Sequence, residues 1–102
     1  MSIVDLFSQK TVFSFEVFPP RRNAPIETIY ETLYELQDLR PDFISVTYGA
    51  GGGENKQSTI SIAEHIKNIC QVTSVVHFPC IGSTKEDILD KIEEFKSAGI
   101  QN

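Results

Sequence analysis

Three short apolar runs at regular intervals are the feature that most constrains the fold of this chain. They cover residues 12–18, 43–48 and 74–78 and are rich in β-branched and aromatic side chains, a composition typical of strands. Glu16 and Thr47 are 31 positions apart, and Thr47 and His77 are 30 apart, which is the length of one strand–helix unit. The spacing therefore predicts an α/β chain with neighbouring parallel strands joined by right-handed crossovers.

Helical patterns fill the intervals around these runs. Pro25 suits the first turn of a helix that Pro41 stops. Residues 83–87 resemble a capping box, and Gly99 suits a helix end. A short leading helix is predicted over residues 2–8, with Ser2 as its candidate N-cap. The apolar stripes expected to pack on the sheet are Ile26, Ile29, Tyr30, Leu33, Leu36 and Leu39; Ile62, Ala63, Ile66 and Ile69; and Ile88, Leu89, Ile92 and Phe95.

Period-two alternation places polar side chains on one face of all three predicted strands. That face carries Ser14 and Glu16 from the first run, Ser45 and Thr47 from the second, and His77 from the third. The opposite faces are apolar and are expected to take the helices. Glu16, Thr47 and His77 lie near the C-terminal ends of their strands, where ligands bind in parallel α/β proteins. An acid, a hydroxyl and an imidazole at this end together predict a functional site.

Each of these residues also has a purely structural interpretation. A glutamate in a strand is often solvated at a sheet edge, a threonine is an ordinary strand residue, and a histidine is often a hydrogen-bonded core residue. The glycine-rich residues 49–53 are interpreted either as a flexible loop or as a place where a ligand approaches the backbone closely. They do not form a G-x-G-x-x-G dinucleotide fingerprint, because Glu54 stands at the position of its last glycine. Residue types and spacing alone leave both interpretations of Glu16, Thr47 and His77 open.

Charge and composition exclude several classes of partner. The nine Lys and Arg form no block and the net charge is −5, so no nucleic-acid-binding surface is expected. No apolar stretch is long enough to span a membrane, and the N-terminus lacks the features of a signal peptide. We therefore expect a cytoplasmic protein in which Cys70 and Cys80 are reduced thiols. Two cysteines and one nearby histidine, His77, do not predict a metal site.

Three strings, in order and with matching spacing, resemble one enzyme family. Residues 15–21, FEVFPPR, resemble the F-E-x-F-P-P-R start of methylenetetrahydrofolate reductases. Residues 45–52, SVTYGAGG, resemble the S-V-T-Y-G-A-G-G segment of that family. Residues 77–81, HFPCI, resemble its H-L-T-C strand end more loosely. The resemblance extends from about residue 12 to the end of the chain and so includes all three apolar runs.

The resemblance implies a (β/α)8 TIM barrel that binds FAD. It implies that a hydride passes from NADH or NADPH through the flavin to 5,10-methylenetetrahydrofolate, giving 5-methyltetrahydrofolate. Glu16 matches the acid that protonates the folate as its five-membered ring opens. Thr47 matches a position close to the flavin and the nicotinamide, and Tyr48, Ala50 and His77 match flavin-contacting positions. An acid on an apolar barrel wall has its neutral form favoured by desolvation, which suits a proton donor.

The length of the chain restricts what it can do alone. Such a barrel needs about 250 residues, whereas this chain has 102. We therefore expect residues 1–102 to form a single partial domain of three consecutive βα units, with an open inner face and two unpaired strand edges. The isolated chain is expected to bind FAD weakly or not at all, to be inactive, and to form a homo-oligomer. Two alternatives remain, namely another TIM-barrel or flavodoxin-like enzyme and a non-catalytic α/β fragment that self-associates through its open sheet face.

Overall fold

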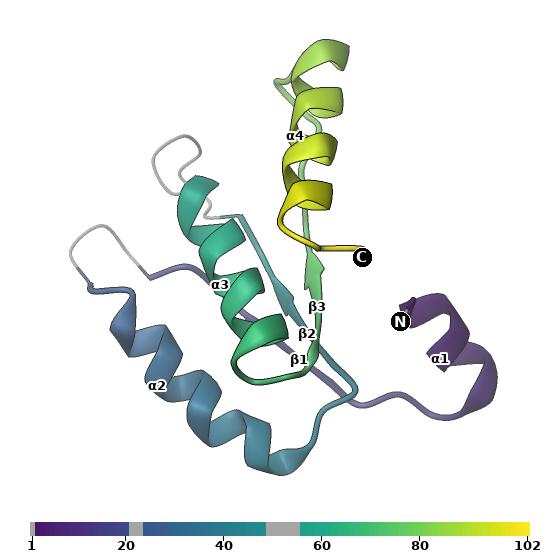
Figure 1. The fold of residues 1–102 in the computed structure, drawn as a ribbon, viewed down its shortest axis with the longest axis vertical. Coiled ribbons are helices and arrows are strands. Elements are labelled where there is room, and N and C mark those ends of the chain that lie inside the picture. Colours follow the sequence, from purple (N-terminus) through teal and green to yellow (C-terminus); the bar gives the residue numbers. More distant parts are fainter. Residues whose placement is uncertain (1, 21–23, 49–55) are drawn as a thin grey trace.

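The structure, a computed structural model, describes residues 2–20, 24–48 and 56–102. The elements follow the order α1 (Ile3–Gln9), β1 (Ser14–Val17), α2 (Glu27–Leu36), the 3-10 helix η1 (Gln37–Leu39), β2 (Phe43–Val46), α3 (Lys56–Asn68), β3 (Thr73–Val76) and α4 (Lys85–Ser97). The three strands form one parallel sheet in the order β1-β2-β3 (Figure 1). The predicted α/β class and parallel pairing are confirmed, and each strand is shorter than the apolar run that predicted it.

The register of the sheet decides which side chains share a face. Glu16 pairs with Ser45, which in turn pairs with Val75, and these three residues lie on one face. The neighbouring row joins Val17, Val46 and Val76 and faces the other way. Val17 and Val46 are buried, whereas Glu16 is exposed. The predicted alternation is therefore confirmed on β1 by burial and on β2 by the register, where Ser45 pairs with Glu16 although it is itself buried.

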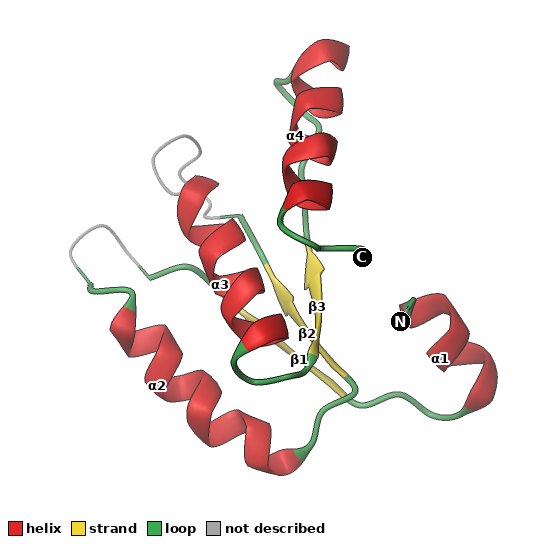
Figure 2. Ribbon diagram, in the orientation of Figure 1, coloured by secondary structure: helices red, strands yellow, loops and turns green. Residues whose placement is uncertain are grey.

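Helices α2 and α3 lie against the apolar face of the sheet (Figure 2). Leu33 of α2 and Ile44 of β2 are fully buried. The buried residues of α3 at helical spacing are Thr59, Ile62, Ala63 and Ile66. Full burial of one Leu or Ile side chain contributes about 1.5–3 kcal/mol, so this layer is the main source of cohesion in the described part of the chain. We call it the helix-covered face, and its opposite the open face.

Four predicted stripe positions are wrong, because Leu39, Ile69, Leu89 and Ile92 are exposed, Ile92 of α4 by 38%. Leu39 is 61% exposed, because the helix tightens into η1 and then stops at Arg40, which has a left-handed backbone ahead of Pro41. Ile69 is 69% exposed, because α3 ends one residue earlier, at Asn68. Leu89 is 53% exposed, because it lies in the first half of α4, away from the sheet. Helical periodicity alone does not show where a helix leaves its packing surface.

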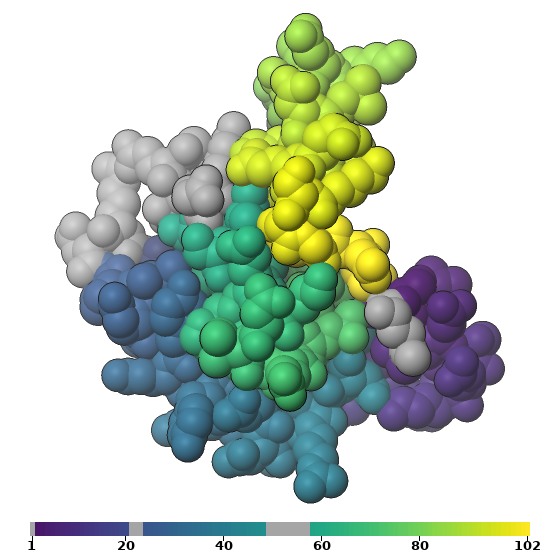
Figure 3. All heavy atoms as spheres, in the orientation of Figure 1, coloured from purple at the N-terminus to yellow at the C-terminus, as the bar shows by residue number. Residues whose placement is uncertain are grey.

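Helix α4 projects beyond the rest of the molecule, as the yellow-green part of Figure 3 shows. Its start confirms the predicted capping box, since the Thr84 hydroxyl accepts from the Asp87 N–H and the Asp87 carboxylate accepts from the Thr84 N–H. The C-terminal end of α4 packs through Phe95 on Phe78, which follows β3. The two rings meet edge-on with their centroids 5.6 Å apart. Gly99 follows with a φ of +77°, a left-handed conformation that glycine adopts without strain.

The two ends of the described chain meet beside β3. The Asn102 side chain accepts a hydrogen bond of 3.1 Å from the Ile3 N–H at the start of α1. The main-chain oxygen of Asn102 accepts another, of 3.0 Å, from the Val76 N–H. Phe7 of α1 also meets Phe43 of β2 edge-on at 6.3 Å. Because Phe43 shares the row of Ser14, α1 covers the N-terminal end of the open face only. None of the helices in the described ranges is long and apolar enough to cross a bilayer.

Candidate active site

Glu16 lies on the open face of β1, where the sequence pattern predicts it. Its register partner on β2 is Ser45, which is buried. The Glu16 side chain is 45% exposed, so the described residues do not supply the apolar enclosure that the resemblance implies for this acid. The reason is the open face itself, because no described helix covers its C-terminal half. The carboxylate is therefore presented at the surface of the sheet.

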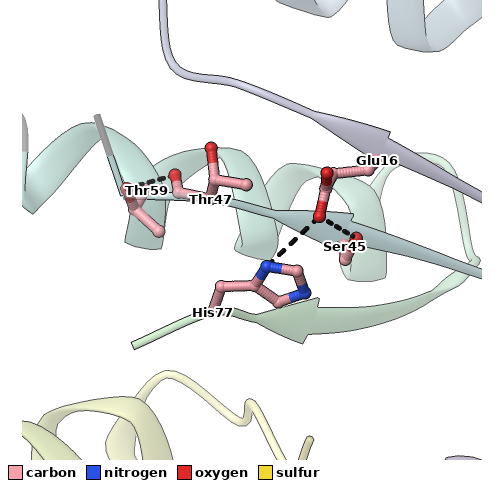
Figure 4. Close-up of polar contacts among 5 residues, drawn as sticks. All are labelled: Glu16, Ser45, Thr47, Thr59 and His77. Carbon is pink, nitrogen blue, oxygen red and sulfur yellow. Dashed lines mark hydrogen bonds and ion pairs between the residues drawn. The ribbon is translucent and has the colours of Figure 1, made fainter. Parts of the chain in front are cut away.

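His77 follows β3 and contacts Glu16. Its main-chain N–H donates to the Val46 carbonyl at 2.9 Å, which continues the strand pairing one residue beyond β3. Its imidazole Nδ1 lies 3.2 Å from the Glu16 Oε1 atom. The hydroxyl of Ser45 lies 3.5 Å from the same oxygen, and Figure 4 shows both contacts ending there. The structure thus brings together three of the polar residues that alternation placed on one face.

Thr47 is held through its backbone rather than through contact with Glu16. Its N–H donates to the Val17 carbonyl at 3.1 Å, and its carbonyl accepts from the Thr59 hydroxyl at 3.2 Å. Thr59 is fully buried on α3, so it ties the end of β2 to that helix (Figure 4). The sequence analysis missed Thr59. It could have been found as the polar member of the stripe that continues through Ile62 and Ile66.

Tyr48 turns to the other side of the strand end. Its ring packs against Phe78 at 5.6 Å, and its hydroxyl oxygen is buried without a hydrogen-bond partner among the described residues. Burial raises the pKa of the Tyr48 hydroxyl, and the nearby Glu94 carboxylate raises it further. A buried hydroxyl of this kind can still take a hydrogen bond from a ligand.

A shallow hollow lies at the C-terminal ends of β2 and β3. It is lined by Thr47, Tyr48, His77, Phe78 and Pro79. Aromatic and apolar walls with a few polar groups are typical of sites that hold flat cofactors, so the residues present fit one side of a flavin ring. Ala50 and the rest of the glycine-rich segment lie outside the described residues. Within the described ranges, no cluster of three or more His, Cys, Asp or Glu residues could hold a metal ion.

The two cysteines are free thiols. Cys70 is partly buried beside the core, and burial raises the pKa of its thiol. Cys80 is exposed, and its sulfur lies 3.9 Å from the Phe78 carbonyl. A raised pKa makes a thiol a poorer nucleophile at neutral pH. We assign neither cysteine a part in the candidate site, because neither lines the hollow at the strand ends.

Comparison with known proteins agrees with the resemblance carried by the three strings. A family model described as Methylenetetrahydrofolate reductase matches residues 2–102. The chain is 36% identical over 93 residues to methylenetetrahydrofolate reductase (NADH) 1 of Arabidopsis thaliana, across 91% of this chain and 16% of that protein. It is 36% and 35% identical over 89 residues to the 5,10-methylenetetrahydrofolate reductases of Pectobacterium carotovorum and Escherichia coli, across 87% of this chain and 30% of each.

The chain thus spans between 16% and 30% of the length of these relatives. The match runs through all three strands and includes Glu16, Thr47 and His77. The family suggested by the sequence strings is confirmed, and the chain belongs to the methylenetetrahydrofolate reductase family.

Proposed function

We propose that this chain supplies the acid and part of the flavin site of an enzyme that reduces 5,10-methylenetetrahydrofolate to 5-methyltetrahydrofolate. The observation that carries the proposal is the Glu16 carboxylate, held by His77 and Ser45 beside the hollow at the strand ends. Family membership supports the reaction type. The plant relative's name specifies NADH, which favours NADH over NADPH as the donor. We place the activity in the cytoplasm, where free thiols persist.

In this proposal FAD, when bound, supplies the hydride chemistry, and the chain supplies positions and one proton. His77, Thr47 and Tyr48 line the hollow that would receive one side of the flavin ring. Glu16 donates a proton to the folate nitrogen that leaves the methylene carbon as the five-membered ring opens. The electron pair of the broken C–N bond stays on that nitrogen, and the carbon becomes the iminium that accepts hydride. A positioned acid typically contributes 10²–10⁴-fold to such a step.

The test is Glu16→Gln in the natural protein that carries this sequence. Glutamine keeps the shape of the side chain but cannot donate a carboxyl proton, so folate turnover should fall at least a hundredfold. Reduction of the flavin by NADH, followed by the loss of its visible absorbance, should be unchanged. Glu35→Gln, on the exposed side of α2, is the matched control and should leave both half-reactions intact. Unimpaired folate turnover in Glu16→Gln would refute the assignment.

We further propose that the whole protein completes an eight-unit β/α barrel around the open face. Three units cannot enclose a flavin. The hollow at the strand ends is shallow, and its residues would contact only one side of the flavin ring. FAD titrated into the 102-residue chain should therefore bind weakly or not at all, measured by flavin fluorescence. Stoichiometric quenching at micromolar FAD would show that these units suffice, and the proposal of a larger enclosure would then be wrong.

A further inference from the structure

The two oxygens of the Glu16 carboxyl group have different surroundings. Oε1 receives two contacts, from His77 Nδ1 at 3.2 Å and from the Ser45 hydroxyl at 3.5 Å. Oε2 has no hydrogen bond or ion pair in the described part of the chain. Figure 4 shows the histidine and the serine approaching the same oxygen from two neighbouring strands. This asymmetry is a property of the site that its residue types alone do not reveal.

The contact from Ser45 is a consequence of strand register. Ser45 is the direct pairing partner of Glu16, and paired residues in neighbouring strands point the same way at about 5 Å separation. Ser45 is only 5% exposed, so its hydroxyl has little water to bind. A separation of 3.5 Å is long for an O–H···O hydrogen bond, but contacts around catalytic groups are often long before the substrate binds and then shorten.

Hydrogen-bond chemistry then assigns the proton. A serine hydroxyl and an Nδ1–H imidazole can both donate, so in the neutral acid form of Glu16 the oxygen that accepts both donors is the carbonyl oxygen. The acidic proton belongs on the other oxygen. When that proton leaves, both donors remain on Oε1 and stabilise the carboxylate that is formed.

We propose that Ser45 is a positioning residue that, together with His77, fixes Oε1 of Glu16 so that Oε2 carries the transferred proton. The inference rests on the proposed function, in which Glu16 is the acid. In the transfer the O–H bond at Oε2 breaks, an N–H bond forms on the leaving nitrogen of the folate, and the electron pair stays on Oε2. Ser45 does not touch the folate in this scheme and acts only through the orientation of Glu16.

The kinetic test uses Ser45→Ala in the natural protein that carries this sequence. Loss of the hydroxyl frees the carboxyl group to rotate, and the folate half-reaction should slow about ten- to a hundredfold, as misplacement of a catalytic group does. Flavin reduction by NADH should be unchanged. Ser74→Ala is the matched control, because Ser74 is equally buried on the neighbouring strand but lies in the row of Ile44, on the helix-covered face. It should leave both half-reactions unchanged.

A second readout needs neither flavin nor turnover. The carboxyl carbon resonance of Glu16, assigned in the 102-residue chain by its loss in Glu16→Gln, should move in Ser45→Ala and stay in place in Ser74→Ala. The chain has only two histidines, so their imidazole nitrogen spectra can be resolved, and neutral His77 should carry its proton on Nδ1. Substitution of Glu16 by Ala should shift that proton toward Nε2.

The outcomes separate the inference from the function on which it rests. If Glu16→Gln abolishes folate turnover while Ser45→Ala matches Ser74→Ala in both rate and resonance, Glu16 is the acid and the role of Ser45 is refuted. If Glu16→Gln retains folate turnover, the proposed function itself fails. If Ser45→Ala slows both half-reactions equally, the serine supports the fold and does not orient the acid, which also overturns the inference.

Discussion

The two faces of the sheet are built from the same strands, but their side chains are buried to different degrees. On the helix-covered face, Ile44 and Val46 are fully buried beneath α2 and α3. On the open face, the side chains of Glu16 and His77 are 45% and 51% exposed. Among the helices of the described ranges, α1 covers the N-terminal end of this face, through Phe7 on Phe43. Along one strand, therefore, one residue lies in the packed core and the next lies at the exposed candidate site.

The difference shows which side-chain positions are fixed by packing within the described residues and which are set by strand register alone. On the helix-covered face Val17, Ile44 and Val46 are buried, so local packing fixes these side chains. On the open face the strand register alone places Glu16, Ser45 and His77, and the final distances there depend on what covers them. Substitutions should therefore affect folding on one face and chemistry or association on the other.

The largest expected effect comes from the centre of the helix-covered face. Ile44→Ala removes a fully buried side chain and should lower the free energy of unfolding by about 2–5 kcal/mol, since the lost transfer energy adds to the cavity term. Urea titration followed by circular dichroism measures it. Ile44→Val, expected to cost about 0.5–1.5 kcal/mol, keeps the effect measurable if the alanine variant does not fold.

The control for this comparison directly follows β1, at Phe18, which lies two residues after Glu16 and therefore by alternation on the open face. Phe18→Ala removes a larger side chain, but Phe18 is 62% exposed, and substitutions at such exposed positions usually change stability by about 0.5 kcal/mol or less. A cost for Phe18→Ala equal to that of Ile44→Ala would mean that the open face is packed as well, and the contrast between the faces would be lost.

The second prediction concerns association of the isolated chain. The open face carries the exposed ring of Phe18 and is expected to pair with a second copy. Phe18→Lys should weaken that pairing about tenfold or more, since burying one Phe contributes about 1.5–3 kcal/mol. Sedimentation equilibrium gives the association constant. Tyr34→Lys, at a position 71% exposed on α2, should leave the constant unchanged. A chain that stays monomeric at millimolar concentration contradicts the prediction.

Much of the fold was predictable, because it follows from short-range patterns. Apolar runs 30–31 residues apart gave the parallel order, and Thr84 with Asp87 marked the start of α4. The errors at Leu39, Ile69, Leu89 and Ile92 share one cause. Periodicity describes a helix face, but the length of strand available to bury that face is set by tertiary structure.

The candidate site was predictable in its members but not in its contacts. Alternation placed Glu16, Ser45 and His77 on one face, and the register confirms this placement. That both donors meet Oε1 depends on side-chain rotamers, which the sequence pattern does not encode. Thr59 was missed because a buried threonine in an apolar stripe looks like an ordinary helix residue until its bond to Thr47 is seen.

A third prediction tests whether α4 unfolds together with the sheet or separately from it. Thr84→Ala removes the hydroxyl of the capping box and should destabilise α4 by about 1 kcal/mol. Amide exchange in the first turn of α4 should accelerate, while exchange in β2 changes little if α4 unfolds separately. Ser83→Ala, one residue before the cap, is the matched control. Equal acceleration in β2 would show that α4 unfolds together with the sheet.

The smallest expected effect is a pH dependence on the helix-covered side. His65 of α3 stacks on Tyr30 of α2, with ring centroids 4.0 Å apart and planes 11° apart. Burial lowers the pKa of His65, so the unfolded chain takes up the proton first, near pH 6.5. Stability should therefore fall as the pH drops from about 7 through the lowered pKa of the folded state, and level off below it.

His65→Gln should remove the contribution of His65 to the dependence of the unfolding free energy on pH, and the contributions of other groups should remain. The expected change is well below the cost of Ile44→Ala, because the imidazole is only partly buried. Burial raises the pKa of Tyr30 in the stack, and the Glu27 and Glu64 carboxylates raise it further. Urea titrations at pH 5, 6 and 7 on both proteins measure the difference. If the pH dependence of the unfolding free energy is the same in His65→Gln, the prediction is wrong. The interface between α2 and α3 would then admit enough water for the imidazole to titrate as it does in the unfolded chain.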